Sequence, residues 1–152
     1  MDRQGDVALL DDPVARDLLV SAIPARLAYI WSDGSPRVVP IYFRWTGEVI
    51  AMGSPPRAPK VRVLESNPGV AITIDGTTWP YKVLMIRGDA DVTVAEDVDP
   101  DYALACERYM GQEAGRAWVT GLAGRPMARI AVRPKWVGIL DFETRFPSAL
   151  TP

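Results

Sequence analysis

Apolar, β-branched and aromatic residues gather along this chain in short runs that polar turns separate. Runs of this length and composition predict β-strands. Most gaps between them are too short for a crossover helix, so the pattern favours antiparallel neighbours. Gly88-Asp89 predicts a turn between two strands that pair with each other. We expect strands at 25–31, 37–45, 49–53, 70–75, 81–88 and 89–95, and two more in MARIAVRP (127–134) and WVGILDF (136–142).

Four stretches have the apolar spacing of helices. Asp12 and Asp99 each precede a proline, and an acidic N-cap followed by proline at the first helical position signals a helix start. The pattern predicts helices over about 13–22, 60–66 and 112–122, and one that opens at Pro100 and has Tyr102, Cys106, Tyr109 and Met110 on its apolar face.

About seven short strands and three or four short helices predict a mainly β (β+α) fold, an antiparallel Greek-key-type barrel with peripheral helices. Pro40 lies inside its run and cannot donate to a ladder, so its strand belongs at a sheet edge or a bulge. No repeat, low-complexity tract or linker interrupts the pattern. We therefore expect residues 1–152 to form a single domain.

Overall charge narrows the choice of partners. The net charge of −2 argues against nucleic acid as the main partner, so any basic patch is local and suits a small anion. No apolar run approaches the roughly 20 residues that span a membrane. The acidic N-terminus lacks the layout of a signal peptide, and a single cysteine excludes an internal disulfide. These features predict a cytoplasmic protein that needs no membrane.

The chain contains no histidine. This excludes Ser-His-Asp and Cys-His catalysis, and with one cysteine it leaves no typical zinc, facial-triad iron or histidine-ligated haem site. Cys106 lies on the apolar face of its predicted helix, which favours packing over a nucleophilic role. We expect no metal site, and any chemistry must come from other groups.

The segment SPPRAPKVRVLESNP (54–68) sets cations among prolines at the start of a predicted helix. Ser54, Arg57, Lys60, Arg62 and the free helix amides would together hold a phosphate or carboxylate. Prolines would fix the loop, so little ordering entropy would be lost on binding. A solvated basic loop that only keeps the surface soluble fits the same spacing, and the residues alone do not separate the two interpretations.

Aromatic residues occur beside two predicted strand ends. Trp79 and Tyr81 flank a proline, and Tyr42 and Phe43 follow another. Such pairs suit either a platform for a flat ring or the packing of a barrel mouth. Arg145, between two aromatics in FETRFP, suits a lid or a dimer clasp equally well.

The ordered set SPRVVPIYFRWTGEVIAMGS, PRAPKVRVLESNPGVAITID and WPYKVLMIRGDADV resembles the split β-barrel of the pyridoxamine 5′-phosphate oxidase superfamily. The resemblance runs from about Ala25 to Val94, and more loosely to Ile139. It implies a homodimer that binds two flavin-type cofactors between its chains. It implies that the strand with Val38, Val39, Pro40, Ile41 and Tyr42 follows the ring, that Gly53, Ser54, Arg57, Lys60 and Arg62 hold the phosphate, and that Trp79 and Tyr81 line the ring from the partner chain.

Two departures refine this expectation. Ala58-Pro59-Lys60 replaces the Ser-Arg-Lys run of the pyridoxamine oxidases, and the C-terminal Arg-x-His motif is absent. The segment PRAPKVR is similar to the actinobacterial branch that uses the deazaflavin coenzyme F(420). The resemblance therefore implies F(420) or FMN as cofactor and argues against true pyridoxamine oxidase activity.

The favoured hypothesis is an oxidoreductase that transfers hydride between this cofactor and a small planar or unsaturated organic substrate. The cofactor supplies the hydride chemistry in such enzymes, so the missing histidine is no obstacle. Solvent or a tyrosine, Tyr42 or Tyr81, would supply a proton. A non-catalytic flavin or deazaflavin carrier and a structural homodimer with a decayed site are the alternatives.

Overall fold

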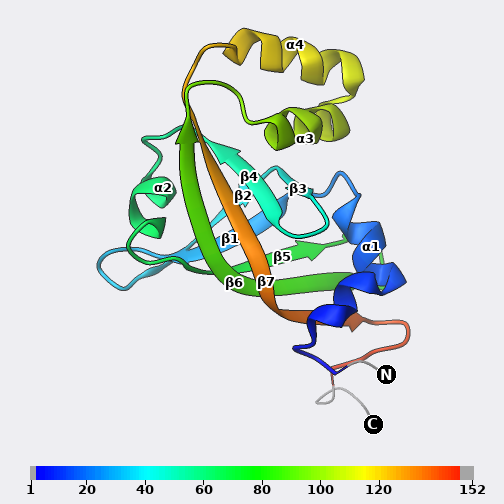
Figure 1. Ribbon diagram of the computed structural model, residues 1–152. Coiled ribbons are helices and arrows are strands. Elements are labelled where there is room, and N and C mark those ends of the chain that lie inside the picture. Colours follow the sequence, from blue (N-terminus) through cyan, green and yellow to red (C-terminus); the bar gives the residue numbers. More distant parts are fainter. Residues whose placement is uncertain (1–2, 148–152) are drawn as a thin grey trace.

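A seven-stranded antiparallel sheet forms the body of the protein in the computed structural model, which describes residues 3–147 (Figure 1). The strand order is β2-β1-β5-β6-β7-β4-β3. The strands are β1 (Ala25–Ile30), β2 (Pro36–Ile41), β3 (Phe43–Trp45), β4 (Ile50–Ser54), β5 (Gly69–Asp75), β6 (Lys82–Ala95) and β7 (Met127–Asp141).

The two edges of this sheet are consecutive in the chain. β2 ends at Ile41 and β3 begins at Phe43, so Tyr42 alone separates the first edge strand from the last. A sheet whose edges lie one residue apart must curl back on itself, which makes a barrel that is open between β2 and β3. The split antiparallel barrel is confirmed, and Pro40 lies in an edge strand as predicted. The single strand predicted over 37–45 is wrong, because the chain changes edges at Tyr42.

The turn predicted at Gly88-Asp89 is wrong. β6 continues through both residues, and its register with β7 shifts between Arg87 and Gly88. Arg87 pairs with Trp136 and Gly88 with Pro134, which leaves Lys135 as the extra residue of a β-bulge. A Cβ at Gly88 would lie 2.5 Å from the carbonyl oxygen of Arg133, so the bulge requires glycine.

The same bulge explains the last two predicted strands, which form one strand. The two were predicted on either side of Lys135, but Pro134 lies next to the bulge, where proline is tolerated, and the strand continues through it. The long β6–β7 pair therefore joins the two halves of the barrel, because residues 83–89 pair with β5 while residues 128–132 pair with β4.

Alternate residues of the strands face inward and fill the barrel with aliphatic side chains. Burying side chains of this size stabilises a fold by about 1.5–3 kcal/mol each. Together with Phe43 and with Leu64 from the helix over residues 59–64, the largest fully buried side chains are Leu27, Ile50, Met52, Ile72, Ile74, Leu84, Ile86, Ile130, Val132 and Ile139.

Helices cover the barrel at three places (Figure 1). η1 (Val7–Asp11) and α1 (Pro13–Leu19) pack at one end, where Leu9, Ala15, Leu18 and Leu19 are buried. α2 (Pro59–Leu64) follows β4, and α3 (Pro100–Met110) with α4 (Gln112–Leu122) forms a helical hairpin over the other end. No helix in residues 3–147 combines the length and apolarity needed to cross a bilayer.

The predicted helix starts are confirmed. The carboxylate of Asp12 accepts from the amide of Val14, and that of Asp99 accepts from the amide of Tyr102. α1 and α2 are shorter than predicted, since each stops when its buried face ends. On α3, Cys106 is buried as expected, but Met110 is exposed.

Candidate functional site at the open edge of the barrel

A hollow of about 340 Å³ lies where the two sheet edges meet. We call it the edge groove. Four of its lining residues were predicted from the sequence to bind a cofactor, so the fold brings this part of the predicted site together. The groove is lined by Pro24, Pro40, Ile41, Tyr42, Gly53 and Tyr102.

Aromatic rings make the walls of the edge groove rigid. Tyr42 stacks on Tyr109, with ring centroids 4.0 Å apart and planes 6° from parallel. The hydroxyl of Tyr109 donates to the carbonyl of Ile23 over 2.9 Å. A Cβ at Gly53 would lie 2.6 Å from Cδ2 of Tyr102, so glycine is what lets that ring lie against the backbone of β4. A flat ligand would meet preformed walls here.

β2 offers a free backbone edge beside the groove. It pairs with β1 on one side only, because it ends the sheet. Val38 points outward with 62% of its surface exposed, whereas Val39 packs against the core. Unpaired amides and carbonyls of an edge strand are available to a ligand, which suits the predicted contact of this strand with a ring.

Three cations follow the groove in the segment between β4 and β5. Arg57, Lys60 and Arg62 form no ion pair with a carboxylate in the part of the chain that the structure describes. Lys60 is partly buried, and burial lowers the pKa of its ammonium group. A partly desolvated cation without an anion is unfavourable, and a bound phosphate would relieve that cost.

Ser54 leads into this basic loop from the end of β4. It is 3% exposed, and its hydroxyl donates to the carbonyl of Pro55 over 3.3 Å. α2 has only six residues, and its N-cap Ala58 supplies no side-chain cap. The helix therefore contributes little dipole, and the side-chain cations carry the attraction for an anion.

Trp79 and Tyr81 lie away from the edge groove within the chain. They stand on the β5–β6 loop, with ring centroids 5.1 Å apart, and Trp79 is 63% exposed. Phe142 and Phe146 extend this group into an aromatic cluster. Trp79 and Tyr81 were predicted to line a cofactor ring bound to the other chain of a dimer, and this contact stays a prediction.

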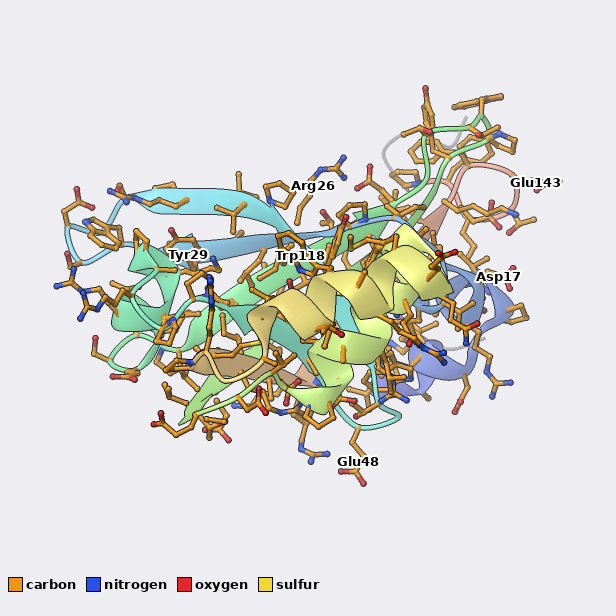
Figure 2. The ribbon with its side chains drawn as sticks, turned by 90° about the horizontal axis from the view of Figure 1, so that it is seen from above. Asp17, Arg26, Tyr29, Glu48, Trp118 and Glu143 are labelled. Atoms are coloured by element: carbon orange, nitrogen blue, oxygen red, sulfur yellow. The ribbon has the colours of Figure 1, made fainter. Side chains whose placement is uncertain are left out.

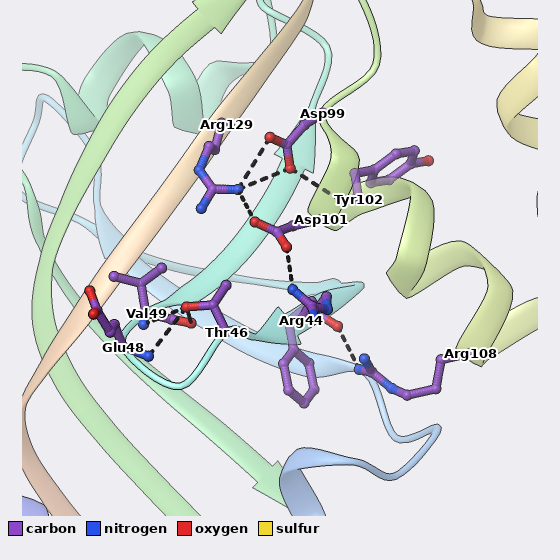
Figure 3. A network of polar contacts seen from close by, with 10 residues as sticks. Arg44, Thr46, Glu48, Val49, Asp99, Asp101, Tyr102, Arg108 and Arg129 are labelled. Atoms are coloured by element: carbon purple, nitrogen blue, oxygen red, sulfur yellow. Dashed lines mark hydrogen bonds and ion pairs between the residues drawn. The ribbon is translucent and has the colours of Figure 1, made fainter.

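A network of charges fixes α3 to the barrel (Figure 3). Nη1 of Arg129 donates to Asp99 over 3.1 Å and to Asp101 over 2.6 Å, and Arg44 also binds Asp101. Burial raises the pKa of Asp101, but the hydrogen bonds from Arg129 and Arg44 outweigh it, so the pKa is lowered. The sequence showed Asp99 only as a helix cap and gave no sign of this network, because Arg44 and Arg129 lie far away in the chain.

A second hollow, of about 250 Å³, lies under the α3–α4 hairpin. We call it the hairpin pocket. Its floor is residues 53–55, and its walls are Tyr102, Trp118, Leu122, Arg125, Pro126 and Met127. Gly53 and Tyr102 also line the edge groove, so the two hollows adjoin.

Trp118 and Tyr102 are tied together in this pocket. Nε1 of Trp118 donates to the hydroxyl of Tyr102 over 3.0 Å, and Trp118 lies on the hairpin ribbon in Figure 2. Burial raises the pKa of Tyr102, which keeps its hydroxyl protonated. The sequence placed Tyr102 on an apolar helix face and gave no role to Trp118 or Arg125; only the tertiary packing of the hairpin brings the three together.

Other chemistry has less support in residues 3–147. Burial raises the pKa of the Cys106 thiol, which disfavours the reactive thiolate. No group of three or more potential metal ligands lies together in this range. Arg145 binds Asp12 at the start of α1, so it ties the two ends of the described chain together.

Several solved structures share the fold of this chain over most of its length. A structure named F420 reductase is 27% identical, with a TM-score of 0.64 over 81% of this chain and 94% of that one. A putative pyridoxamine 5′-phosphate oxidase from Listeria innocua is 20% identical, with a TM-score of 0.64 over 86% and 98%. An FAD- and heme-binding protein from Mycobacterium smegmatis is 18% identical, with a TM-score of 0.61 over 87% and 71%.

No family model and no curated protein matches this chain. The structural likeness covers most of the chain and agrees with the strand order and barrel closure described above. The resemblance found in the sequence is thereby confirmed at the level of the fold: the chain folds as a split β-barrel, as the pyridoxamine 5′-phosphate oxidase-like structures do.

Proposed function

We propose that this protein is a flavin- or deazaflavin-dependent oxidoreductase that acts on a small planar or unsaturated organic substrate. The observation that carries the proposal is the set of unpaired cations in the loop that follows the edge-groove residue Gly53 in the chain. Arg57, Lys60 and Arg62 come within nine residues of Gly53 and lack carboxylate partners in residues 3–147. A phosphate on a tail and a flat ring are the two features of a ligand that would fit both parts.

The chain's own residues would bind and orient while the bound ring supplies hydride transfer. The stacked pair Tyr42 and Tyr109 forms a fixed wall. The hydroxyl of Tyr102 accepts a hydrogen bond from Trp118 and, because its pKa is raised, stays protonated. It can therefore donate its proton, and it joins Tyr42 as a candidate proton source for the reaction. Tyr81 lies away from the groove of its own chain and is the weaker candidate.

Within this proposal we favour deazaflavin coenzyme F(420) over FMN. The segment Ala58-Pro59-Lys60 departs from the oxidase pattern, and the structure named F420 reductase has higher identity to this chain than the oxidase-like one. A cofactor with further anionic groups also suits a loop with three free cations better than a single phosphate does.

We further propose that the protein acts as a homodimer. The outer face of β1, β2 and β5 carries small or apolar residues, among them Ala28, Val38 and Ala71, beside the Arg26–Asp75 ion pair. A second copy that docks on this face would cover it and bring the exposed Trp79 and Tyr81 toward the edge groove of the first. The partner would then complete the site.

Turnover by the cofactor-loaded, reduced protein tests the enzyme proposal. Enones, quinones and tetrapyrroles form the substrate panel, and oxidation of the cofactor is followed by its absorbance. We expect turnover of at least one class, with loss in the Tyr102→Phe variant if that hydroxyl supplies the proton. Tight cofactor binding without turnover of any class would instead identify a carrier.

A further inference from the structure

We propose that the hairpin pocket binds the substrate and selects one that carries a carboxylate, with Arg125 as the selecting residue. The substrate class is then a planar unsaturated acid of about one ring. This inference rests on the proposed function, in which the cofactor's ring occupies the edge groove. Gly53 and Ser54, which were expected to hold the cofactor's phosphate, form the floor of the hairpin pocket, so cofactor and substrate would meet there. It names a residue and a substrate chemistry for the adjoining hollow.

The lining of the pocket has one charge in an otherwise apolar and aromatic wall. Arg125 is its sole charged residue, and Trp118, Leu122 and Met127 supply flat or aliphatic surface. A pocket of this kind binds the body of a ligand by apolar contact and orients it by one polar group. At about 250 Å³ the pocket is smaller than those for drug-sized ligands, so a compact molecule fits it.

Arg125 is held in place by its backbone, while its guanidinium stays free. Its amide donates to the carbonyl of Leu122 over 3.1 Å. The amide of Gly124, which has a φ of +77°, donates to the carboxylate of Asp97 over 2.9 Å. The guanidinium has no carboxylate partner in residues 3–147, in contrast to Arg116 on α4, which binds Glu107 over 2.7 Å.

Trp118 gives the pocket a surface for a ring. It is 50% exposed in spite of its size, and its bond to Tyr102 fixes the orientation of the indole. Tyr102 stands at the boundary with the edge groove, so a ring against Trp118 lies next to the place proposed for the cofactor. A carboxylate on that ring would point to Arg125 and form a bidentate, charge-assisted pair.

Binding of two isosteric probes tests this inference without turnover. trans-Cinnamate and trans-cinnamamide differ only in the terminal group, which is an anionic carboxylate in the first and a neutral amide of similar shape in the second, and calorimetry measures the affinity of the full chain for each. We expect wild type to bind cinnamate at least about tenfold more tightly than cinnamamide, the scale of one charge-assisted pair. Arg125→Gln should abolish the difference, and Arg116→Gln, an exposed arginine outside the pocket, should keep it.

Equal affinity of wild type for the two probes, absence of binding of both, or a preference that survives Arg125→Gln would each overturn the inference. The same samples are titrated with FMN and with F(420). Unchanged affinity of Arg125→Gln for both cofactors supports a substrate site, whereas weaker F(420) binding alone assigns Arg125 to that cofactor's carboxylates and overturns it. Failure of the proposed function is a separate result, since it is the absence of cofactor binding to wild type.

Discussion

At the scale of single residues, the cationic side chains fall into two groups, those that pair with a carboxylate and those that do not. Arg44, Arg129 and Arg145 bind carboxylates that hold helices to the barrel. Arg57, Lys60 and Arg62 have no such partner in the described residues, although Lys60 is partly buried. Residues of the first group support the fold, and removal of the second group should leave it intact.

We predict that the double substitution of Arg57 and Lys60 by alanine weakens cofactor binding tenfold or more. Together the lost charge-assisted hydrogen bonds should cost on the order of 1.5–3 kcal/mol of binding free energy. Fluorescence titration measures the affinity, and thermal unfolding checks that the fold is retained. Arg133→Ala is the matched control, because this exposed arginine pairs with Glu48 outside the loop. Unchanged affinity in the double variant would remove the basic loop from the site.

Acid stability tests the role of Asp101. Its pKa is lowered in the folded protein, so ionised Asp101 stabilises the fold at pH values above its ordinary value of 3.8. That stabilisation is lost as the pH falls through the lower, folded pKa. We expect Asp101→Asn to lose stability at neutral pH and to show a flatter decline of unfolding free energy below pH 3.8. Urea titrations at several pH values measure both effects, and parallel pH curves for the two proteins would refute them.

At the scale of elements, the α3–α4 hairpin forms the cover of the hairpin pocket. α4 reaches the rest of the protein through α3, and the two helices approach closely at Gly115. A Cβ there would lie 2.6 Å from the Cα of Glu107, in the backbone of α3. Contacts this close leave no room for a side chain.

Two glycines on α4 give a matched test of this packing. Gly115→Ala must separate the helices, and we expect it to destabilise the protein by about 1–3 kcal/mol, as overpacking does. Gly121→Ala meets nothing within 4 Å, and in a helix alanine should be neutral or stabilise by about 0.5–1 kcal/mol. Urea unfolding compares the two variants. Similar stability of both would mean that the helices do not pack as described.

The sequence predicted where strands and helices begin, because those signals lie within a few residues. It could not predict features that depend on contacts between residues far apart in the chain. Asp12 and Asp99 were found as caps because the cap and its amide are neighbours in sequence. Gly88 suggested a turn, and the last two strands were separated at Lys135, whereas the pairing of Gly88 with Pro134 across β6 and β7 makes a bulge in continuous strands. For the same reason the sequence found the basic loop but missed Tyr102, Trp118 and Arg125.

At the scale of the whole molecule, closure of the barrel places the site. Tyr42 carries the chain from one sheet edge to the other beside the edge groove, and the basic loop follows β4, whose Gly53 lines that groove. The groove is open to the outside. A partner copy would therefore both cover the outer sheet face and complete the walls around a bound ring.

The dimer proposal has a direct test by light scattering. We expect a mass of twice the 16.7 kDa of the chain. Val38→Asp puts a charge on the proposed interface and should produce monomers, because burying an unpaired charge is costly. Val94→Asp, at a similarly exposed valine on β6, should leave the mass unchanged. A monomeric wild type would contradict the proposal.

Titration of the purified protein with F(420) and with FMN tests the central claim, that the edge groove and the basic loop bind a phosphate-bearing, flavin-type cofactor. Quenching of cofactor fluorescence should saturate with a Kd of about 1 µM or lower for at least one of the two cofactors. A Kd of that size corresponds to a binding free energy of about −8 kcal/mol. F(420) should bind more tightly than FMN. No saturation by either cofactor would contradict the claim.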